Sequence, residues 1–545
     1  MSLATKAARG AIWSILSGVG SRAIGLISTL VLTRFVLPAE YGAVSVATVV
    51  VLTASNLTGF GLFHWVIATP SASRSSIFHA TFYHLLFGAV AFAVVLGYKD
   101  GWGPMFGSPN AATYIPGLVL ATVFMRVGYP AERMLVRDLR FGQLGILRGV
   151  TELLYAMVSI GAAIYGFGGM AIVYGNVVQW GVFLLGCLYL SPWREWIEPA
   201  KLTWAQTKEL FSFGLPMTFG DIAHRAAKTW DNLLVSRYFG EATVGRYNLA
   251  YNLADIPATH VGEHIGEVLL PSFARLDAES RAEALIRATR LLGVIIFPMA
   301  VGLSAIAHTA TAAIFDPRWA QMAPMLMMLA ALSVVRPLGW TIGSYQLAER
   351  QPVMVMALEV AKVFLLLGMI VLLSPKGILW ACLAPGVAFT FHAVGSMIAV
   401  RITSGVSFAR LGGGVIPPLL ATGPMVGAVI GTRYLLRLIG LEASFLTLAL
   451  EIVAGGIAFI PAAFIIAPST ARDLLDTTKR ALLNRGGDDD DEGDDDEASD
   501  PEASDPEAPD PEASDPEASD PEASDPEASD PEASEASSPD ASDKK

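Results

Sequence analysis

Fourteen apolar stretches that are long enough, or nearly long enough, to cross a lipid bilayer follow one another along the first 470 residues of this chain. A helix rises about 1.5 Å per residue, so about 20 apolar residues span the hydrocarbon core. Membrane-spanning strands are a poor alternative, because they alternate apolar and polar residues over short segments. We therefore predict an all-α integral membrane protein of about 14 transmembrane helices, with spans at Ala11–Leu32, Gly42–Ala68, Ala80–Gly97, Ala112–Tyr129, Val150–Phe167, Gly169–Leu190, Leu215–Val235, Ala250–Leu270, Leu291–Ala307, Ala323–Leu347, Val353–Leu373, Gly377–Val400, Ile416–Tyr434 and Leu446–Ala467.

The composition agrees with a membrane protein whose C-terminal tail differs sharply in charge from its body. The chain is 53% hydrophobic and only 16% charged, outside the usual range of soluble domains. Residues 488–545 hold 26 Asp and Glu against 2 Lys, and residues 1–487 hold 24 against 35 Lys and Arg, so the tail is net −24 and the body net +11. The two cysteines, Cys187 and Cys382, lie in apolar runs and are expected to be packing residues.

The charges between the spans predict the orientation of the chain. With a cytoplasmic N-terminus, the loops assigned to the cytoplasm hold 21 Lys and Arg, and the outer loops hold 8. This bias has the sign that the positive-inside rule requires. We therefore expect a multi-pass membrane protein with both termini in the cytoplasm.

An internal repeat with a constant offset of 203 residues divides the body. Placing residues 33–47 over residues 236–250 aligns Arg34 with Arg237, Gly42 with Gly245 and Ala47 with Ala250, and upstream it aligns Arg22 with Arg225. The offset equals six spans, and repeats of this kind are typical of secondary transporters, whose substrate sites lie between the halves. The predicted organisation is an N-terminal six-helix lobe (1–192), an interfacial linker (193–211), a C-terminal six-helix lobe (212–402) around a central cavity, two additional transmembrane helices (403–470), a basic juxtamembrane segment (471–487) and a disordered acidic tail of DPEAS repeats (488–545).

The seventh predicted span carries ionisable residues on one face. At about 100° per residue, these positions fall within an arc of about 120°. If four such charges faced lipid, they would cost on the order of 10–14 kcal/mol, so the face must line water or a partner helix. The residues are Asp221, His224, Arg225, Lys228 and Asp231.

The eighth predicted span repeats this arrangement with acidic residues and histidines. His260, Glu263, His264 and Glu267 share an arc of about 100°, and Asp255 lies off that arc. The two histidines are four residues apart but lack an evident third ligand, so a hydrated helix face is preferred to a metal site.

A hydrated cavity rich in Arg and Lys would attract anions, and the forked donors of arginine suit phosphate. The candidates for substrate binding are Arg22, Arg225, Lys228 and, from another span, Arg126. The carboxylates would either balance these cations or take up H⁺ or Na⁺ during a transport cycle. The candidates for ion coupling are Asp221, Asp231, Asp255, Glu263 and Glu267.

Several charged residues and glycines could have structural roles instead of functional ones. Glu359 and Lys362, three residues apart, are expected to form a buried pair. Arg336, before Pro337, would satisfy the carbonyls of a broken helix, and Asp231 would be solvated if it lay near the outer surface. In the thirteenth span, the glycines at 423, 427 and 431 form a small-residue stripe, which predicts a helix-packing face.

Three segments resemble polysaccharide-type flippases of the multidrug/oligosaccharidyl-lipid/polysaccharide exporter superfamily, in particular the Wzx-type, colanic-acid-exporter-like branch. They are residues 10–47, 129–149 and 213–257, and the resemblance extends over about residues 1–470. It implies two six-helix lobes around a central cavity and transport of a polyprenyl-diphosphate-linked oligosaccharide from the cytoplasmic to the periplasmic leaflet. It also implies cationic cavity residues for the diphosphate, matched by Arg22, Arg225 and Lys228. The acidic tail is not part of the family pattern.

Two other classes of function stay open at this level. One is an ion-coupled exporter of small organic compounds on the same fold. The other is a membrane enzyme, such as a polymerase or ligase that acts on the same polysaccharide. The sequence contains no nucleophile motif, metal cluster, P-loop or dinucleotide fingerprint for such an enzyme. We expect a non-enzymatic transporter without a cofactor, with membrane lipid and a lipid-linked oligosaccharide as partners and no nucleic acid. The acidic tail is either a solvated extension or a docking segment for basic partners, such as a polysaccharide polymerase.

Overall fold

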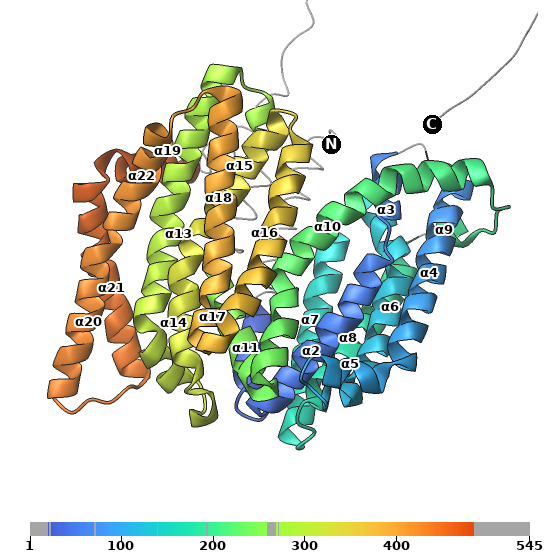
Figure 1. The fold of residues 1–545 in the computed structure, drawn as a ribbon, viewed down its shortest axis with the longest axis horizontal. Coiled ribbons are helices and arrows are strands. Elements are labelled where there is room, and N and C mark those ends of the chain that lie inside the picture. The colour runs from blue at the N-terminus through green and yellow to red at the C-terminus, as the bar shows by residue number, and fades with distance from the viewer. Residues whose placement is uncertain are drawn as a thin grey trace, which may run out of the picture. The chain divides into compact units, whose positions relative to one another are not determined.

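The computed structural model describes residue 20 and residues 23–69, 72–138, 140–191, 194–258, 269–270 and 272–483. The chain divides into two units, residues 1–481 and 482–545, and the description below concerns the first. Every regular element in the described ranges is a helix (Figure 1). The predicted tail at 488–545 lies outside the described residues, and so does half of the first predicted span, of which Ala23–Leu32 is helical.

The N-terminal lobe consists of helices that follow the predicted spans closely. The second span is interrupted after Leu57, where Phe60 and Gly61 take positive φ angles of 47° and 55°, and a short helix follows. The helices are α2 (Pro38–Leu57), α3 (Leu62–Ala68), α4 (Arg74–Gly97), α5 (Lys99–Met105), α6 (Ala111–Arg137), α7 (Phe141–Ile164), α8 (Met170–Leu190) and α9 (Arg194–Ile197).

The C-terminal lobe begins with α10 (Trp204–Phe239), a single 36-residue helix. Figure 1 shows it as one long ribbon that starts beside α9 and ends at α11. Residues 204–211, which the sequence assigned to the linker, are thus the first turns of α10. An apolar stretch marks only the part of a helix that lies in lipid, so hydropathy places the start of such a helix too late.

The rest of this lobe and the C-terminal helices complete the described chain. They are α11 (Glu241–Pro257), α13 (Ala278–Ile314), η2 (Pro317–Trp319), α14 (Met322–Leu332), η3 (Ser333–Val335), α15 (Arg336–Ala348), α16 (Pro352–Leu373), η4 (Ser374–Lys376), α17 (Ile378–Ala381), α18 (Leu383–Ser404), α19 (Phe408–Leu420), α20 (Thr422–Leu438), α21 (Phe445–Ile466) and α22 (Pro468–Leu483).

Eleven helices in the described ranges are long and apolar enough to cross a membrane, and each overlaps one of the fourteen predicted spans. The other three predicted spans are the first and the eighth, which the structure describes only in part, and the seventh, which is α10. The charged residues of α10 keep it out of a count based on hydropathy. The all-α membrane fold is confirmed, whereas the number fourteen stays a prediction.

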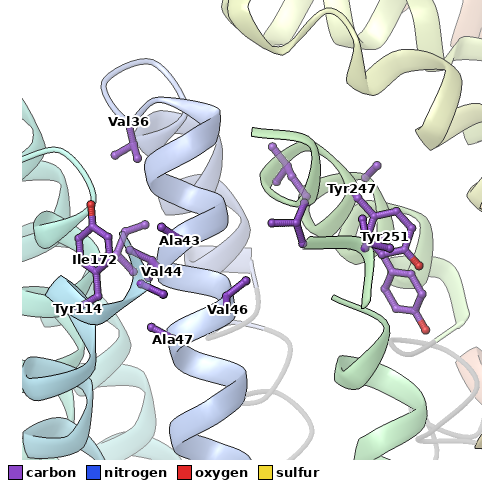
Figure 2. Packing of buried hydrophobic residues seen from close by; sticks show 14 of the residues in the cluster. Val36, Ala43, Val44, Val46, Ala47, Tyr114, Ile172, Tyr247 and Tyr251 are labelled. Carbon is purple, nitrogen blue, oxygen red and sulfur yellow. The ribbon is translucent and has the colours of Figure 1, made fainter. Parts of the chain in front are cut away.

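A core of buried apolar side chains joins helices of both lobes. On one side of α2, Val44 and Ala47 face Tyr114 of α6 and Ile172 of α8, and Tyr247 of α11 belongs to the same cluster (Figure 2). Small and β-branched residues allow α2 to be enclosed on both sides. This packing makes α2 and α11 the common centre of the two lobes.

The two lobes meet through a reciprocal contact between α2 and α11. These helices begin at Pro38 and Glu241, 203 positions apart, which is the offset of the repeat. A Cβ atom added at Gly42 would lie 1.9 Å from the Glu241 carbonyl oxygen, and one added at Gly245 would lie 2.0 Å from the Pro38 carbonyl oxygen. Because equivalent residues contact each other in both directions, the contact has the form of a pseudo-two-fold interface. Any side chain at either glycine would push the helices apart.

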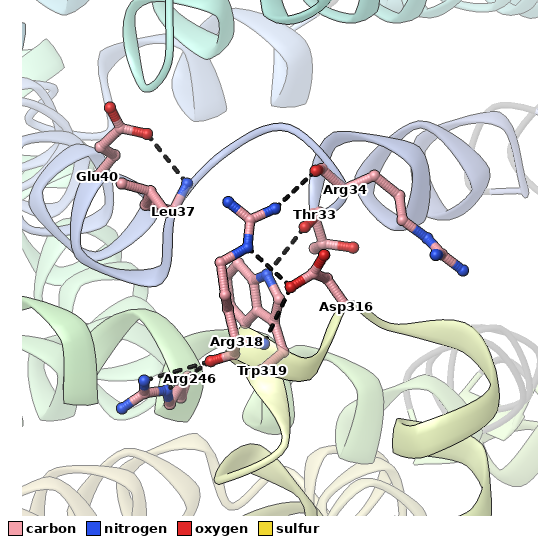
Figure 3. A network of polar contacts seen from close by, with 8 residues as sticks. All are labelled: Thr33, Arg34, Leu37, Glu40, Arg246, Asp316, Arg318 and Trp319. Atoms are coloured by element: carbon pink, nitrogen blue, oxygen red, sulfur yellow. Dashed lines mark hydrogen bonds and ion pairs between the residues drawn. The ribbon is translucent and has the colours of Figure 1, made fainter. Parts of the chain in front are cut away.

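Hydrogen bonds from the loops reinforce this end of the molecule. The indole nitrogen of Trp319 donates to the Thr33 carbonyl at 2.9 Å, and Arg318 donates to the Arg34 carbonyl at 2.8 Å (Figure 3). On the other lobe, the hydroxyl of Ser108 donates to the Glu241 carboxylate at 2.9 Å. All three contacts involve loops that the charge pattern assigns to the outer side.

Candidate functional site

Two adjoining cavities lie along α2 and α10. The first, the N-lobe pocket, has a volume of about 510 Å³ and is lined mainly by α2, α3, α6, α8 and α10. The second, the central pocket, has a volume of about 420 Å³ and is lined by α2, α7, α8, α10 and α11. They adjoin because six residues line both: Thr48, Leu52, Asn56, Asn176, Ile222 and Arg225.

Three of the five ionisable residues on the charged face of α10 line these cavities. Arg225 is exposed and lines both pockets, and it is the cation that they share. Lys228, one turn later, lines the central pocket, and its Nζ lies 6.0 Å from the centre of the Trp340 ring. Asp221 lines the N-lobe pocket, with its Oδ2 3.7 Å from Nε2 of His64 on α3.

Arg126 lines the N-lobe pocket, but its donors are turned to the protein. Its Nε donates to the His84 carbonyl at 2.8 Å, Nη1 to the Ser55 carbonyl at 2.7 Å, and Nη2 to the Thr58 carbonyl at 2.7 Å. Ser55 and Thr58 lie where α2 ends, and the last carbonyls of a helix lack partners within it. Arg126, which is 3% exposed, therefore caps the interruption between α2 and α3.

The predicted acidic residues separate into different environments. Asp231 is fully buried and accepts from the hydroxyl of Tyr247 at 2.8 Å and from the amide of Asn232 at 2.9 Å. The expectation that Asp231 is solvated near the outer surface is therefore wrong, because α11 covers it. Asp255 forms an ion pair with Arg336 of α15. Arg22, Glu263 and Glu267 lie outside the described residues.

A compact ionic cluster lies in the C-terminal lobe around a cavity of about 30 Å³, which Lys228 also lines. Arg336 stacks against Tyr251 and Phe389 besides pairing with Asp255, and it donates to no helix-end carbonyl among the described residues. The predicted pair of Glu359 and Lys362 is confirmed, with Nζ and Oε2 2.5 Å apart. His392 places its Nε2 3.2 Å from the other oxygen of Glu359.

Neutral polar residues also line the cavities, and the pattern of ionisable residues in the sequence does not predict them. In the central pocket, Asn252 donates to Asn248 at 3.1 Å, and Asn248 donates to Asn232 at 3.3 Å. In the N-lobe pocket, Gln179 donates to Glu152 at 2.7 Å. One signal was present in the sequence: two asparagines four residues apart on an apolar helix fall on one face. Among the described residues, no group of three His, Cys, Asp or Glu side chains could hold a metal.

The arrangement suits a large anionic and polar molecule better than a small apolar one. Cations of α10 stand beside amides and aromatic rings in a cavity enclosed by membrane helices. Within such low-dielectric walls, a cation attracts an anion more strongly than it does in water.

Comparisons with known proteins agree with the fold and with the family that the sequence resembles. A family model described as polysaccharide biosynthesis protein matches residues 31–324, which is more than half of the chain. The chain is 26% identical over 375 residues to the lipopolysaccharide biosynthesis protein WzxC of Escherichia coli (strain K12), covering 68% of this chain and 76% of that protein. It is 29% identical over 324 residues to the succinoglycan biosynthesis transport protein ExoT of Rhizobium meliloti, covering 58% of this chain and 64% of that protein.

Among solved structures, the fold is similar to that of the lipid II flippase MurJ in an inward closed conformation. The TM-score is 0.67 at 12% sequence identity, and the match covers 85% of this chain and all of that one (100%). The predicted resemblance is thus confirmed at the levels of family and fold, and the chain belongs to the polysaccharide biosynthesis protein family of multi-pass membrane proteins.

Proposed function

We propose that this protein is a flippase that moves polyprenyl-diphosphate-linked oligosaccharide repeat units across the bacterial inner membrane by alternating access. The product would serve exopolysaccharide, capsule or O-antigen synthesis. The proposal rests on one observation above all: Arg225 is an exposed cation that faces two adjoining cavities inside a bundle of membrane helices. Intramembrane cations are costly, and those that face a cavity commonly mark a substrate or ion pathway.

The diphosphate would bind at Arg225 and Lys228. A guanidinium offers paired donors to a phosphate, and an ammonium adds a point charge. Arg22 remains a candidate through its alignment with Arg225, whereas Arg126 would act on this site by holding the end of α2 in place. The relatives named for lipopolysaccharide biosynthesis and for succinoglycan transport support this class of substrate.

The direction of transport would follow from the charge pattern and from the closed end. The lobes are joined where α2 meets α11, at the end assigned to the outside, whereas the N-lobe pocket reaches Glu132 and Arg133 near the inner end of α6. A substrate would therefore enter from the cytoplasmic leaflet, with both termini of the protein in the cytoplasm. Such a cycle requires the α2–α11 contact to open.

Coupling to H⁺ or Na⁺ would involve a carboxylate in the C-terminal lobe. Asp231 is our first candidate, because it is buried and its two described donors, Tyr247 and Asn232, are neutral. Asp255 and Asp221 face charged or titratable partners and are second choices. We propose no cofactor and no enzymatic step.

Arg225→Gln tests the proposal in a strain that lacks the chromosomal copy. We expect loss of the polymer and accumulation of polyprenyl-linked repeat units on the cytoplasmic leaflet, with the variant still present in the membrane. Accumulation is measured by extracting lipid-linked sugars from spheroplasts after leaflet-selective enzymatic digestion. The matched control is Arg237→Gln, because Arg237 lies on the same helix, is exposed and lines neither pocket.

Three results would contradict the proposal in different ways. Export retained by Arg225→Gln would remove Arg225 from the site. Exported but unpolymerised units in the deletion strain would indicate a polymerase. Unchanged lipid-linked pools together with altered drug resistance would indicate an exporter of small compounds.

A further inference from the structure

The N-lobe pocket contains buried polar atoms that have no hydrogen-bond partner in the described part of the chain. His84 of α4 is only 6% exposed, yet neither Nδ1 nor Nε2 is bonded. Nε of Arg133 on α6 is also buried and unbonded. Both residues line the same pocket. A buried polar group without a partner costs about 1–3 kcal/mol. Residues that carry three such atoms line this cavity, so a polar ligand that reached these atoms would relieve that cost.

The His84 ring is held in place by aromatic neighbours. It stacks on Tyr129, with ring centres 5.2 Å apart, and meets Phe63 edge-on at 5.4 Å. Arg133 also contacts Tyr129: its Cζ lies 4.5 Å from the centre of the Tyr129 ring. The unbonded nitrogens are therefore fixed in position before any ligand arrives, which lowers the entropic cost of binding.

The chemistry of the remaining lining identifies the class of ligand. A neutral imidazole offers one donor and one acceptor, as a hydroxyl group requires, and Asn56 and Asn176 offer both kinds of group from their amides. Trp180 contributes an aromatic ring, whose face suits the apolar C–H groups of a sugar ring. The pocket volume of about 510 Å³ lies within the range of small-molecule sites. Hydroxyl-rich ligands match this combination, and apolar chains do not.

Given the proposed function, on which this step depends, we infer that the N-lobe pocket is the subsite for the sugar portion of the substrate. Arg225 lines both pockets, so a diphosphate bound at Arg225 and Lys228 can carry its sugar directly into the N-lobe pocket. His84, Tyr129 and Arg133 then contact the sugar, and the cations of α10 contact the diphosphate. Recognition of the sugar and of the diphosphate is thereby divided between two groups of residues.

The test is equilibrium binding to the full-length protein in lipid nanodiscs with two probes. One probe is undecaprenyl diphosphate without sugar. The other is the lipid-linked repeat unit extracted from the deletion strain. His84→Phe keeps the aromatic packing and removes both nitrogens, and we expect it to weaken binding of the glycosylated probe about three- to tenfold while leaving binding of the sugar-free probe unchanged.

A second variant and a matched control guard against a folding defect. Tyr129→Phe removes only a hydroxyl from the same pocket and is expected to show the same selectivity for the glycosylated probe. Tyr83→Phe is the control, because its hydroxyl bonds to Thr207 and it does not line the pocket. The control should bind both probes as the unmodified protein does.

Failure of this inference and failure of the proposed function give different results. Suppose that Arg225→Gln weakens the binding of both probes. If His84→Phe and Tyr129→Phe then leave the binding of both probes unchanged, or weaken it equally for the two probes, the sugar subsite is wrong and the diphosphate site stands. If the unmodified protein binds neither probe, both are wrong.

Discussion

At the scale of single residues, the structure separates two arginines that look alike in the sequence. Arg126 and Arg225 both lie in predicted membrane spans and were both candidates for substrate binding. Arg225 faces the cavities, whereas Arg126 donates to two carbonyls at the end of α2 and to the His84 carbonyl of α4. The capping role of Arg126 could not be predicted, because hydropathy does not reveal that the second span is interrupted after Leu57.

Arg126→Gln tests this distinction. Removing the guanidinium leaves buried carbonyls without donors, so we expect the free energy of unfolding to fall by on the order of 3 kcal/mol. The measurement is the thermal unfolding temperature of the purified protein in detergent, compared with Arg225→Gln, which should unfold like the unmodified protein. An unchanged unfolding temperature combined with lost binding of undecaprenyl diphosphate would return Arg126 to the substrate site.

At the scale of helices, the glycines show that a small-residue motif does not by itself identify the face on which two helices pack. The sequence predicted a packing face from the stripe at 423, 427 and 431, yet in the described structure a Cβ atom at any of these positions would meet no atom within 4 Å. None of the described helices covers this side of α20, so the stripe is not a packing face within the described part of the chain. Gly42 and Gly245, which the sequence offered only as a repeat match, are the glycines at which two helices touch.

Gly245→Ala should weaken the closed end, because its Cβ atom would overlap the Pro38 carbonyl oxygen. We expect the α2–α11 contact to open more often. The readout is labelling of Ser45→Cys, a substitution in the central pocket, by a membrane-impermeant maleimide added from outside. Both native cysteines are buried, so background labelling should be low.

Gly427→Ala is the matched control, since its added Cβ atom has open space around it. Labelling in the control should equal that of the parent Ser45→Cys protein. Equal labelling in Gly245→Ala as well would mean that the contact does not close the outer end.

At the scale of the whole molecule, the charge pattern raises a question about the tail. Residues 488–545 are net −24, whereas the rest of the chain is net +11. A chain without large apolar residues cannot bury enough surface to fold alone, so the tail is expected to be extended and solvated.

Deletion of residues 488–545 should leave export unchanged, since every residue proposed for the site precedes residue 270. Polymer yield per amount of membrane-inserted protein is the measurement, with the full chain expressed at the same level as the reference. A drop in export with normal insertion would favour the alternative, in which the tail docks basic partners such as a polymerase.

The sequence alone determined the class of this protein. The apolar stretches, the loop charges and the 203-residue offset are properties of the linear chain, so they predicted a helical membrane protein with two repeated halves without knowledge of any contact. The resemblance to the family rests on the residues of three segments, 10–47, 129–149 and 213–257. The periodicity of α10 also predicted that its charged residues share one face, and Asp221, Arg225 and Lys228 of that face line the two cavities.

Only the tertiary structure decided which polar residues act together. The neighbours of these residues come from helices that are far apart in the sequence. Arg225 faces a cavity, Asp255 pairs with Arg336, and His84 stacks on Tyr129 only because those helices pack together. The cost of burying a polar group is set by the neighbours that enclose it, and those neighbours exist only after the helices have packed.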